Sequence, residues 1–219
     1  HVSHELKTPL TALREGVALL REEVPGQLGI AQREVVDILQ HNVIGLQRQI
    51  EGLLSLNAAA FEGSRLARRP VALREFLVDA ARRRDLHSQA RQLTLQIEAP
   101  ETVVSVDDEK LAVIVDNLLS NAIDFSPEGG EIRLLASAGN GRLTVEVIDQ
   151  GPGVAAEDSE RIFEPFVQGR RKASAPRQGS GVGLSIVREL VRALGGSVRL
   201  LPSAAGAHFS VELPDEKQQ

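Results

Sequence analysis

Apolar residues recur along the first 24 residues at the spacing of an amphipathic helix. The steps are four, three, four, three and four residues, as in a heptad seam, at Leu6, Leu10, Leu13, Val17, Leu20 and Val24. Pro25 and Gly26 end this pattern, and a second apolar stripe predicts a helix from about Ala31 to Ala60. A short loop between two helices predicts an antiparallel hairpin. Because a lone hairpin cannot shield two apolar faces, residues 1–61 are predicted to pair into a dimeric four-helix bundle.

The pattern changes after residues 62–70, a short basic stretch with glycine and proline that is predicted to be a linker. Within residues 71–219, helices are expected at 74–91, 108–124 and 182–194, with a short one near 157–162. Strand hairpins are expected at 93–98 with 103–106, at 131–137 with 142–149, and at 197–201 with 207–213. Helices that alternate with antiparallel hairpins predict a two-layer α/β sandwich.

The composition excludes several functional classes. The chain has 219 residues, 42% of them hydrophobic and 25% charged, as is ordinary for a globular protein. A net charge of -5 argues against nucleic-acid binding by bulk electrostatics, and the absence of cysteine excludes disulfides and thiolate metal sites. No apolar run is long enough to span a bilayer, and no signal peptide is visible. The chain opens inside a heptad without methionine, so we expect a piece of a longer protein whose sensor or membrane segment lies upstream.

His4 stands out in the first helix. It lies about 120° around the helix axis from Leu10, so its imidazole should face water. Glu5 follows it directly, Thr8 lies one turn further on nearly the same face, and Pro9 should kink the helix. This arrangement suits an accessible nucleophile with a carboxylate beside it. A plain surface histidine explains the stretch equally well.

Two polar motifs lie in the second half of the chain. Asn117 and Asn121 share one face of a predicted helix, where their carbonyl oxygens could ligate a hard cation such as Mg²⁺. They could instead be structural asparagines that cap neighbouring loops. Asp149 ends a predicted strand and could accept a hydrogen bond from an exocyclic amine, while Gly151 and Gly153 allow a flat ligand to approach the backbone. The same residues are also ordinary turn chemistry.

A third motif is rich in glycine. Gly179, Gly181 and Gly183 precede a predicted helix, and free amides at such a position bind phosphates. The motif does not fit a dinucleotide fingerprint and lacks the lysine and hydroxyl residue of a P-loop. Arg170 and Arg171 make the upstream segment basic, which suits a lid over a polyphosphate, although a solvated loop would look the same.

The order of these motifs resembles the sensor histidine kinases of bacterial two-component systems. The motifs are H-E-x-x-T-P, N-x-x-x-N, D-x-G-x-G, F-x-P-F and G-x-G-x-G, and together they cover almost the whole chain. The resemblance implies a HisKA hairpin for dimerisation and phosphotransfer at residues 1–61, and a catalytic ATP-binding domain of the Bergerat (GHKL) fold at residues 71–219. The stretch HELKTPLTALREG is most similar to the GlrK/QseE kinases of Gram-negative bacteria.

The resemblance implies ATP and Mg²⁺ as cofactors. It also implies a response-regulator receiver domain as partner, a homodimer, and a cytoplasmic position below an inner-membrane sensor. His4 would accept the phosphoryl group, Glu5 would orient its imidazole and accept its proton, and Thr8 would position water for dephosphorylation. Asn121 would ligate Mg²⁺, and Asp149 would bind the adenine amino group. The nucleotide site would comprise Asn117, Asn121, Asp149, Gly151, Gly153, Phe163, Phe166, Arg170, Arg171, Gly179, Gly181, Gly183 and Leu184.

One position departs from the family pattern. Asp124 stands where these kinases often carry a lysine or arginine that reaches the phosphates. Two alternatives therefore remain: an ATP-driven conformational clamp of the same nucleotide fold, or a dimeric scaffold with weak catalysis. A clamp would need a transducer domain after the nucleotide fold, and the chain carries a phosphoacceptor hairpin before it instead.

Overall fold

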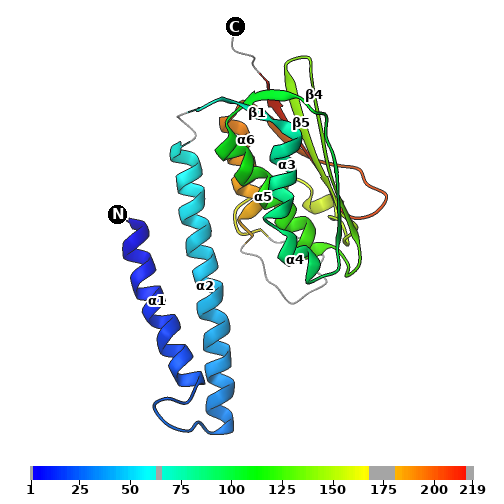
Figure 1. Ribbon diagram of the computed structural model, residues 1–219. Coiled ribbons are helices and arrows are strands. Elements are labelled where there is room, and N and C mark those ends of the chain that lie inside the picture. The colour runs from blue at the N-terminus through cyan, green and yellow to red at the C-terminus, as the bar shows by residue number, and fades with distance from the viewer. Residues whose placement is uncertain (1, 63–65, 168–180, 216–219) are drawn as a thin grey trace. The chain divides into compact units, whose positions relative to one another are not determined.

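The computed structural model describes residues 2–62, 66–167 and 181–215, and only the backbone at residues 2–8, 41, 48–49 and 51–62. The chain forms two compact units that meet within one helix, near Ser55. The first unit is built from α1 (Val2–Arg21) and α2 (Ile30–Glu62), which run antiparallel and side by side (Figure 1). The helical hairpin predicted from the apolar stripes is therefore present.

The hairpin buries only part of its predicted seam. Leu10 and Val17 of α1 and Val36 of α2 are buried, whereas Leu13 is 53% exposed and Val24 is 64% exposed. Part of the seam of α1 is therefore packed within the hairpin, and the rest is exposed. Within the described residues, the hairpin keeps an uncovered apolar face, as a bundle-forming hairpin would.

The loop of the hairpin is tied across its base by charged side chains. Arg33 Nε lies 2.7 Å from Glu23 Oε1, and Arg21 Nε lies 3.6 Å from Asp37 Oδ1. Gly26 has a positive φ of 147°, which lets the chain turn between the helices. These contacts are exposed, so they fix the local geometry more than they stabilise the fold.

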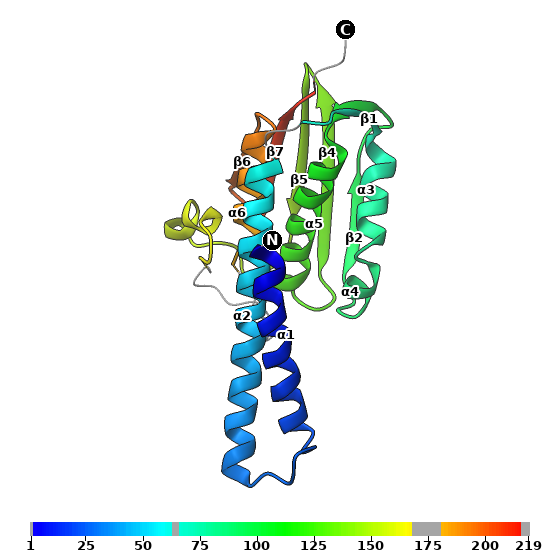
Figure 2. The same cartoon turned by 90° about the vertical axis from the view of Figure 1, so that its left-hand side faces the viewer.

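The second unit contains a five-stranded sheet with the order β2-β4-β5-β7-β6. The strands are β2 (Thr94–Glu98), β4 (Glu131–Gly139), β5 (Arg142–Ile148), β6 (Ser197–Leu201) and β7 (His208–Pro214). β2 runs parallel to β4, and the other neighbours are antiparallel. Figure 2 shows α3 (Leu73–Arg82), α5 (Asp108–Phe125) and α6 (Gly183–Ala193) lying over this sheet. The two-layer α/β sandwich predicted from the sequence is confirmed.

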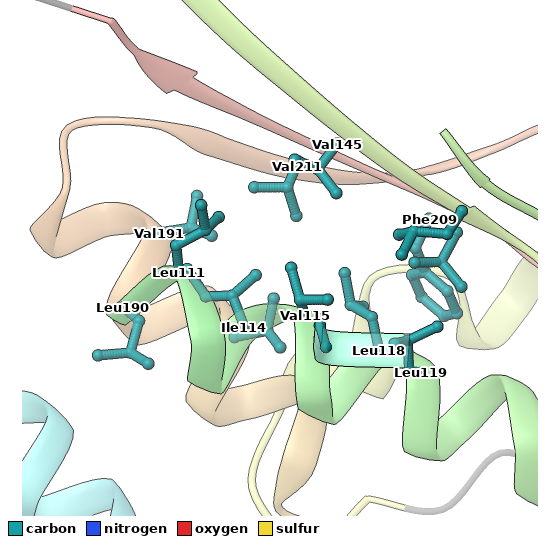
Figure 3. Packing of buried hydrophobic residues seen from close by; sticks show 14 of the residues in the cluster. Leu111, Ile114, Val115, Leu118, Leu119, Val145, Leu190, Val191, Phe209 and Val211 are labelled. Carbon is teal, nitrogen blue, oxygen red and sulfur yellow. The ribbon is translucent and has the colours of Figure 1, made fainter. Parts of the chain in front are cut away.

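The hydrophobic core lies between α5, α6 and the inner face of the sheet. Figure 3 shows the apolar side chains of α5 pointing towards Val145 of β5 and Val211 of β7. Those side chains are fully buried and recur at helical spacing: Leu111, Ile114, Val115, Leu118 and Leu119. Burying a large aliphatic side chain stabilises a fold by about 1.5–3 kcal/mol, so this face fixes α5 firmly on the sheet. The opposite face of α5 carries polar residues.

The prediction that 93–98 and 103–106 form a hairpin is wrong. β2 pairs with β4, whereas β3 (Val103–Val106) pairs with β1 (Arg69–Ala72) in a separate two-stranded sheet. The chain changes direction at Pro100, whose carbonyl accepts a hydrogen bond from Thr102 N–H (3.0 Å). This tight turn, together with a proline that cannot donate to a ladder, redirects the chain out of the first sheet.

Smaller elements also differ from the prediction. The helix expected over 74–91 is two helices, α3 and α4 (Asp85–Gln89), because the chain bends at Arg83 and Arg84. The helix expected near 157–162 is two short 3₁₀ turns, at Ala156–Asp158 and Arg161–Phe163. None of the helices described is long and apolar enough to cross a membrane.

Candidate functional site

The polar face of α5 borders two loops, and each loop carries a motif singled out in the sequence. One loop follows β5 and contains Asp149, Gly151 and Gly153, and the other leads into α6 at Gly183. The start of α5 is fixed by Asp107, whose Oδ1 accepts from Lys110 N–H (3.1 Å) and whose Oδ2 accepts from Ala67 N–H (3.0 Å). Although burial alone would raise it, the bonds from Lys110 and Ala67 hold the pKa of Asp107 below its usual range.

Asp149 is a buried carboxylate, and one of its two oxygens accepts two hydrogen bonds. Its side chain is 4% exposed, and Oδ1 accepts from Gly151 N–H (2.8 Å) and Ala207 N–H (3.0 Å). Burial raises the pKa of Asp149, and the two backbone bonds partly oppose that effect. Among the described residues, none donates a hydrogen bond to Oδ2, which therefore remains an acceptor for a ligand.

Two glycines allow this carboxylate to be packed so closely. A Cβ at Gly151 would lie 2.7 Å from the Phe125 carbonyl oxygen and 2.9 Å from Asp149 Oδ1. A Cβ at Gly206 would lie 1.8 Å from the Asp149 carbonyl oxygen, and Gly206 has a φ of +71°. Gly206 and Ala207 were not predicted as site residues. Both act through the backbone, so the only signal in the sequence is a glycine in the loop before the last strand.

The two asparagines of α5 have different surroundings. Asn117 Nδ2 donates to the Val113 carbonyl (2.8 Å), and a Cβ at Gly183 would lie 2.9 Å from Asn117 Oδ1. Asn117 is thus held in one orientation against the start of α6, where the amides of the first turn are directed outwards. Asn121 is half-buried, and its side chain makes no hydrogen bond to any residue whose placement is described. Its carbonyl oxygen is therefore available to a cation.

The chain segments on either side of residues 168–180 meet directly. Phe166 N–H donates to the Gly181 carbonyl (2.9 Å), and both residues have positive φ, 63° and 69°. A Cβ at Gly181 would lie 3.0 Å from the Phe166 backbone, and the positive φ also disfavours a side chain, so glycine is strongly favoured there. Phe166 is 42% exposed, whereas Phe163 is buried edge-on against Phe209 with ring centroids 6.1 Å apart.

Several predicted site residues are described in part or not at all. Arg170, Arg171 and Gly179 lie outside the described residues. Gly153 has a φ of +68° in the loop after β5, and Leu184 packs half-buried against the core beside Gly183. The loop and the start of α6 therefore provide backbone surfaces around a ligand site, with few side chains in the way.

Comparison with known proteins identifies this arrangement. Residues 106–217 match the family described as "Histidine kinase-, DNA gyrase B-, and HSP90-like ATPase", and residues 1–59 match the His Kinase A (phospho-acceptor) domain. The chain belongs to the sensor histidine kinases. It is 35% identical over 218 residues to the sensor histidine kinase GlrK of Escherichia coli, covering 99% of this chain and 46% of GlrK. It is 32% identical to the alginate biosynthesis sensor protein KinB of Pseudomonas aeruginosa, covering 97% of this chain and 36% of KinB.

Solved structures agree with this family. Full-length ShkA in complex with AMPPNP superposes with a TM-score of 0.73 at 29% identity, covering 99% of this chain and 45% of ShkA. The Acinetobacter baumannii histidine kinase AdeS gives a TM-score of 0.69 at 20% identity, covering 98% of both chains, and shows the shared fold. This kinase chain spans less than half the length of the relatives GlrK and KinB.

The remaining predicted residues of the kinase lie in the first turns of α1. His4, Glu5 and Thr8 are part of the helix Val2–Arg21, whereas their side chains lie outside the described part of the structure. Pro9 is accommodated within the helix. The helical position of His4 matches the prediction, and its role remains a prediction.

Proposed function

We propose that this chain is the catalytic core of a sensor histidine kinase that transfers a phosphoryl group from ATP to His4 and then to an aspartate of a response regulator. The observation that carries the proposal is the geometry of Asp149. One oxygen is fixed by two backbone amides, and the other is left to accept a hydrogen bond. The exocyclic amine of adenine is the matching donor. The AMPPNP complex of ShkA supports the same assignment.

The residues present also fit Mg²⁺. A magnesium ion in such sites takes one or two protein oxygens and completes its octahedron with phosphates and water. Asn121 would supply the protein oxygen, and Asn117 would lie beside it, fixed through Val113. When bound, Mg²⁺ would neutralise charge on the phosphates during transfer. The amides at Gly181, Gly183 and Leu184, with Gly179, would face the phosphates, as helix N-termini do.

His4 would be the nucleophile. Imidazole is largely neutral at physiological pH, so Glu5 could hold the Nδ1 proton and leave the Nε2 lone pair free for in-line attack. Thr8 would position water when the same surface dephosphorylates the regulator. Phe163 and Phe166 would hinge a lid that carries Arg170 and Arg171, and those arginines would bind the phosphates.

The proposed assembly follows from the uncovered face of the hairpin. A second copy packed on Leu13, Leu20 and Val24 would complete a four-helix bundle at residues 1–61. Residues 71–219 would form the catalytic domain and residues 62–70 the linker, although strand β1 already begins at Arg69. The complete protein would place this core on the cytoplasmic side of an inner membrane.

Autophosphorylation with labelled ATP tests the proposal. The wild-type chain should give an acid-labile, base-stable phosphoprotein, and His4→Gln should give none. His87 is an exposed histidine on α4, so His87→Gln is the matched control and should label normally. Equal labelling of His4→Gln and wild type would reject His4 as the acceptor.

The metal assignment needs a separate variant. Asn121→Asp should abolish labelling because it adds a negative charge beside the phosphates and removes the amide donors, whereas Asn140→Asp, in the turn between β4 and β5, should not. Wild-type turnover by Asn121→Asp would reject the proposed Mg²⁺ ligand.

A further inference from the structure

The C-terminal end of α5 carries an acidic side chain and no basic one. The last carbonyl groups of a helix lack partners within the helix and carry partial negative charge, which favours a cation nearby. The last turn of α5 contains no basic residue, and it carries Asp124 instead. The C-cap residue Ser126 donates its N–H to the Ala122 carbonyl (3.0 Å). The following carbonyl groups need donors from elsewhere in the chain.

Arg91 supplies those donors from the turn between α4 and β2. Its Nη1 donates to the carbonyl oxygens of Ile123 and Asp124, the latter at 2.8 Å, and its Nη2 donates to the Ser126 carbonyl at 2.7 Å. The Arg91 carbonyl also accepts from Gly129 N–H (3.1 Å). Both the side chain and the backbone of Arg91 therefore hold the end of α5 and the turn that follows it. The side chain is half-buried, which limits screening of these bonds by water.

The segment held by Arg91 is part of the nucleotide site. Asn121 lies two residues before the first carbonyl that Arg91 binds. The Phe125 carbonyl, in the middle of the segment, is so close to Gly151 that a Cβ there would lie 2.7 Å away. Gly151 in turn donates its N–H to Asp149 Oδ1. Arg91 is thus connected through the backbone to both ends of the proposed site, the cation ligand and the adenine acceptor.

We propose that Arg91 is a positioning residue for nucleotide binding, acting through the last turn of α5 and its contact with Gly151. This inference rests on the proposed function. Arg91 does not touch the nucleotide, so it should alter affinity more than the chemical step. An arginine is needed because its planar fork reaches three carbonyl groups, whereas a lysine ammonium would reach fewer in the right directions. Arg91 also brings a positive charge beside the turn that contains Asp124, where related kinases often carry a lysine or arginine.

Titration of the full chain with a fluorescent ATP analogue and Mg²⁺ tests the inference. Arg91→Met keeps most of the apolar stem but removes all three bonds, and we expect roughly tenfold weaker binding, equivalent to one lost hydrogen bond to a charged group. Arg91→Lys should fall between Arg91→Met and wild type. In autophosphorylation, both variants should raise KM for ATP and leave kcat at saturating ATP within about twofold. Arg82 is an exposed arginine paired with Asp79, so Arg82→Met is the matched control and should bind like wild type.

Each outcome decides the matter. Wild-type affinity in Arg91→Met overturns the inference, and so does a fall in kcat with KM unchanged. If Arg91→Met does not fold, as circular dichroism and urea unfolding would show, Arg91→Lys decides: affinity equal to that of wild type overturns the inference. Failure of the wild-type chain to bind the analogue would instead reject the proposed function.

Discussion

The most informative single substitution is Gly206→Ala, in the loop before β7. Gly206 has a φ of +71°, which costs an L-residue about 1–2 kcal/mol. The added Cβ would also lie 1.8 Å from the Asp149 carbonyl oxygen, so the loop must move by more than an ångström to accept it. Such a movement would separate the two backbone segments that hold Asp149.

The contacts at risk give the magnitude. Ala207 N–H donates to Asp149 Oδ1 at 3.0 Å, and Asp149 N–H donates to the Ala207 carbonyl at 3.0 Å. A hydrogen bond to a charged group contributes about 1.5–3 kcal/mol and a neutral one about 0.5–1.5 kcal/mol. With the backbone strain, the loss in unfolding free energy should be about 3–6 kcal/mol, a large part of the total for a domain.

Urea unfolding of the full chain and nucleotide titration measure the two consequences. Gly206→Ala should lower the unfolding free energy of the second unit by that amount and weaken nucleotide binding at least about tenfold, since the orientation of Asp149 is lost. Gly139→Ala is the matched control, because a Cβ at Gly139 meets no atom within 4 Å. Unchanged stability in Gly206→Ala would refute the reasoning from the close approach, and unchanged affinity would refute the role of the Ala207 bond.

Two further predictions concern pH and assembly. Burial raises the pKa of Asp149, so the folded chain binds this proton more tightly than the unfolded chain does. The resulting contribution to the unfolding free energy is present at low pH, and it is lost as pH rises from the ordinary aspartate pKa through the raised one. The urea stability of Asp149→Asn relative to wild type should therefore increase across that interval while adenine binding is lost; a constant difference would contradict the shift. Leu13→Glu should weaken dimerisation at least about 30-fold by equilibrium sedimentation, because it places a charge on the uncovered face. Ala12→Glu, off the seam, should not, and equal dimerisation of the two variants would exclude this face.

Hydrophobic periodicity predicted α1, α2, α5 and α6 and the buried face of α5, because that information is local. It did not predict the break between α3 and α4. The apolar stripe predicted for α5 recurs at helical spacing, and every residue of the stripe is buried: Leu111, Ile114, Val115, Leu118, Leu119 and Ala122. Strand partners were less predictable. A period of two residues shows which side of β2 faces the core but not which strand lies beside it. That choice depends on the turn at Pro100 and on the distant β1, neither of which has a signature in the alternation of β2 or β3.

The residues of the candidate site also differ in how well the sequence predicts them. Residues that act through side chains, such as Asp149 and Asn117, stand out because a carboxylate or amide among apolar residues costs free energy unless it has a partner. Gly206 and Ala207 act through backbone atoms that every residue possesses, so no side-chain pattern marks them. Arg91 lies 32 to 35 residues from the carbonyl groups it binds, and an arginine near a surface turn is ordinary in any sequence. Sequence patterns therefore find the groups that would contact a nucleotide more readily than the groups that hold them in place.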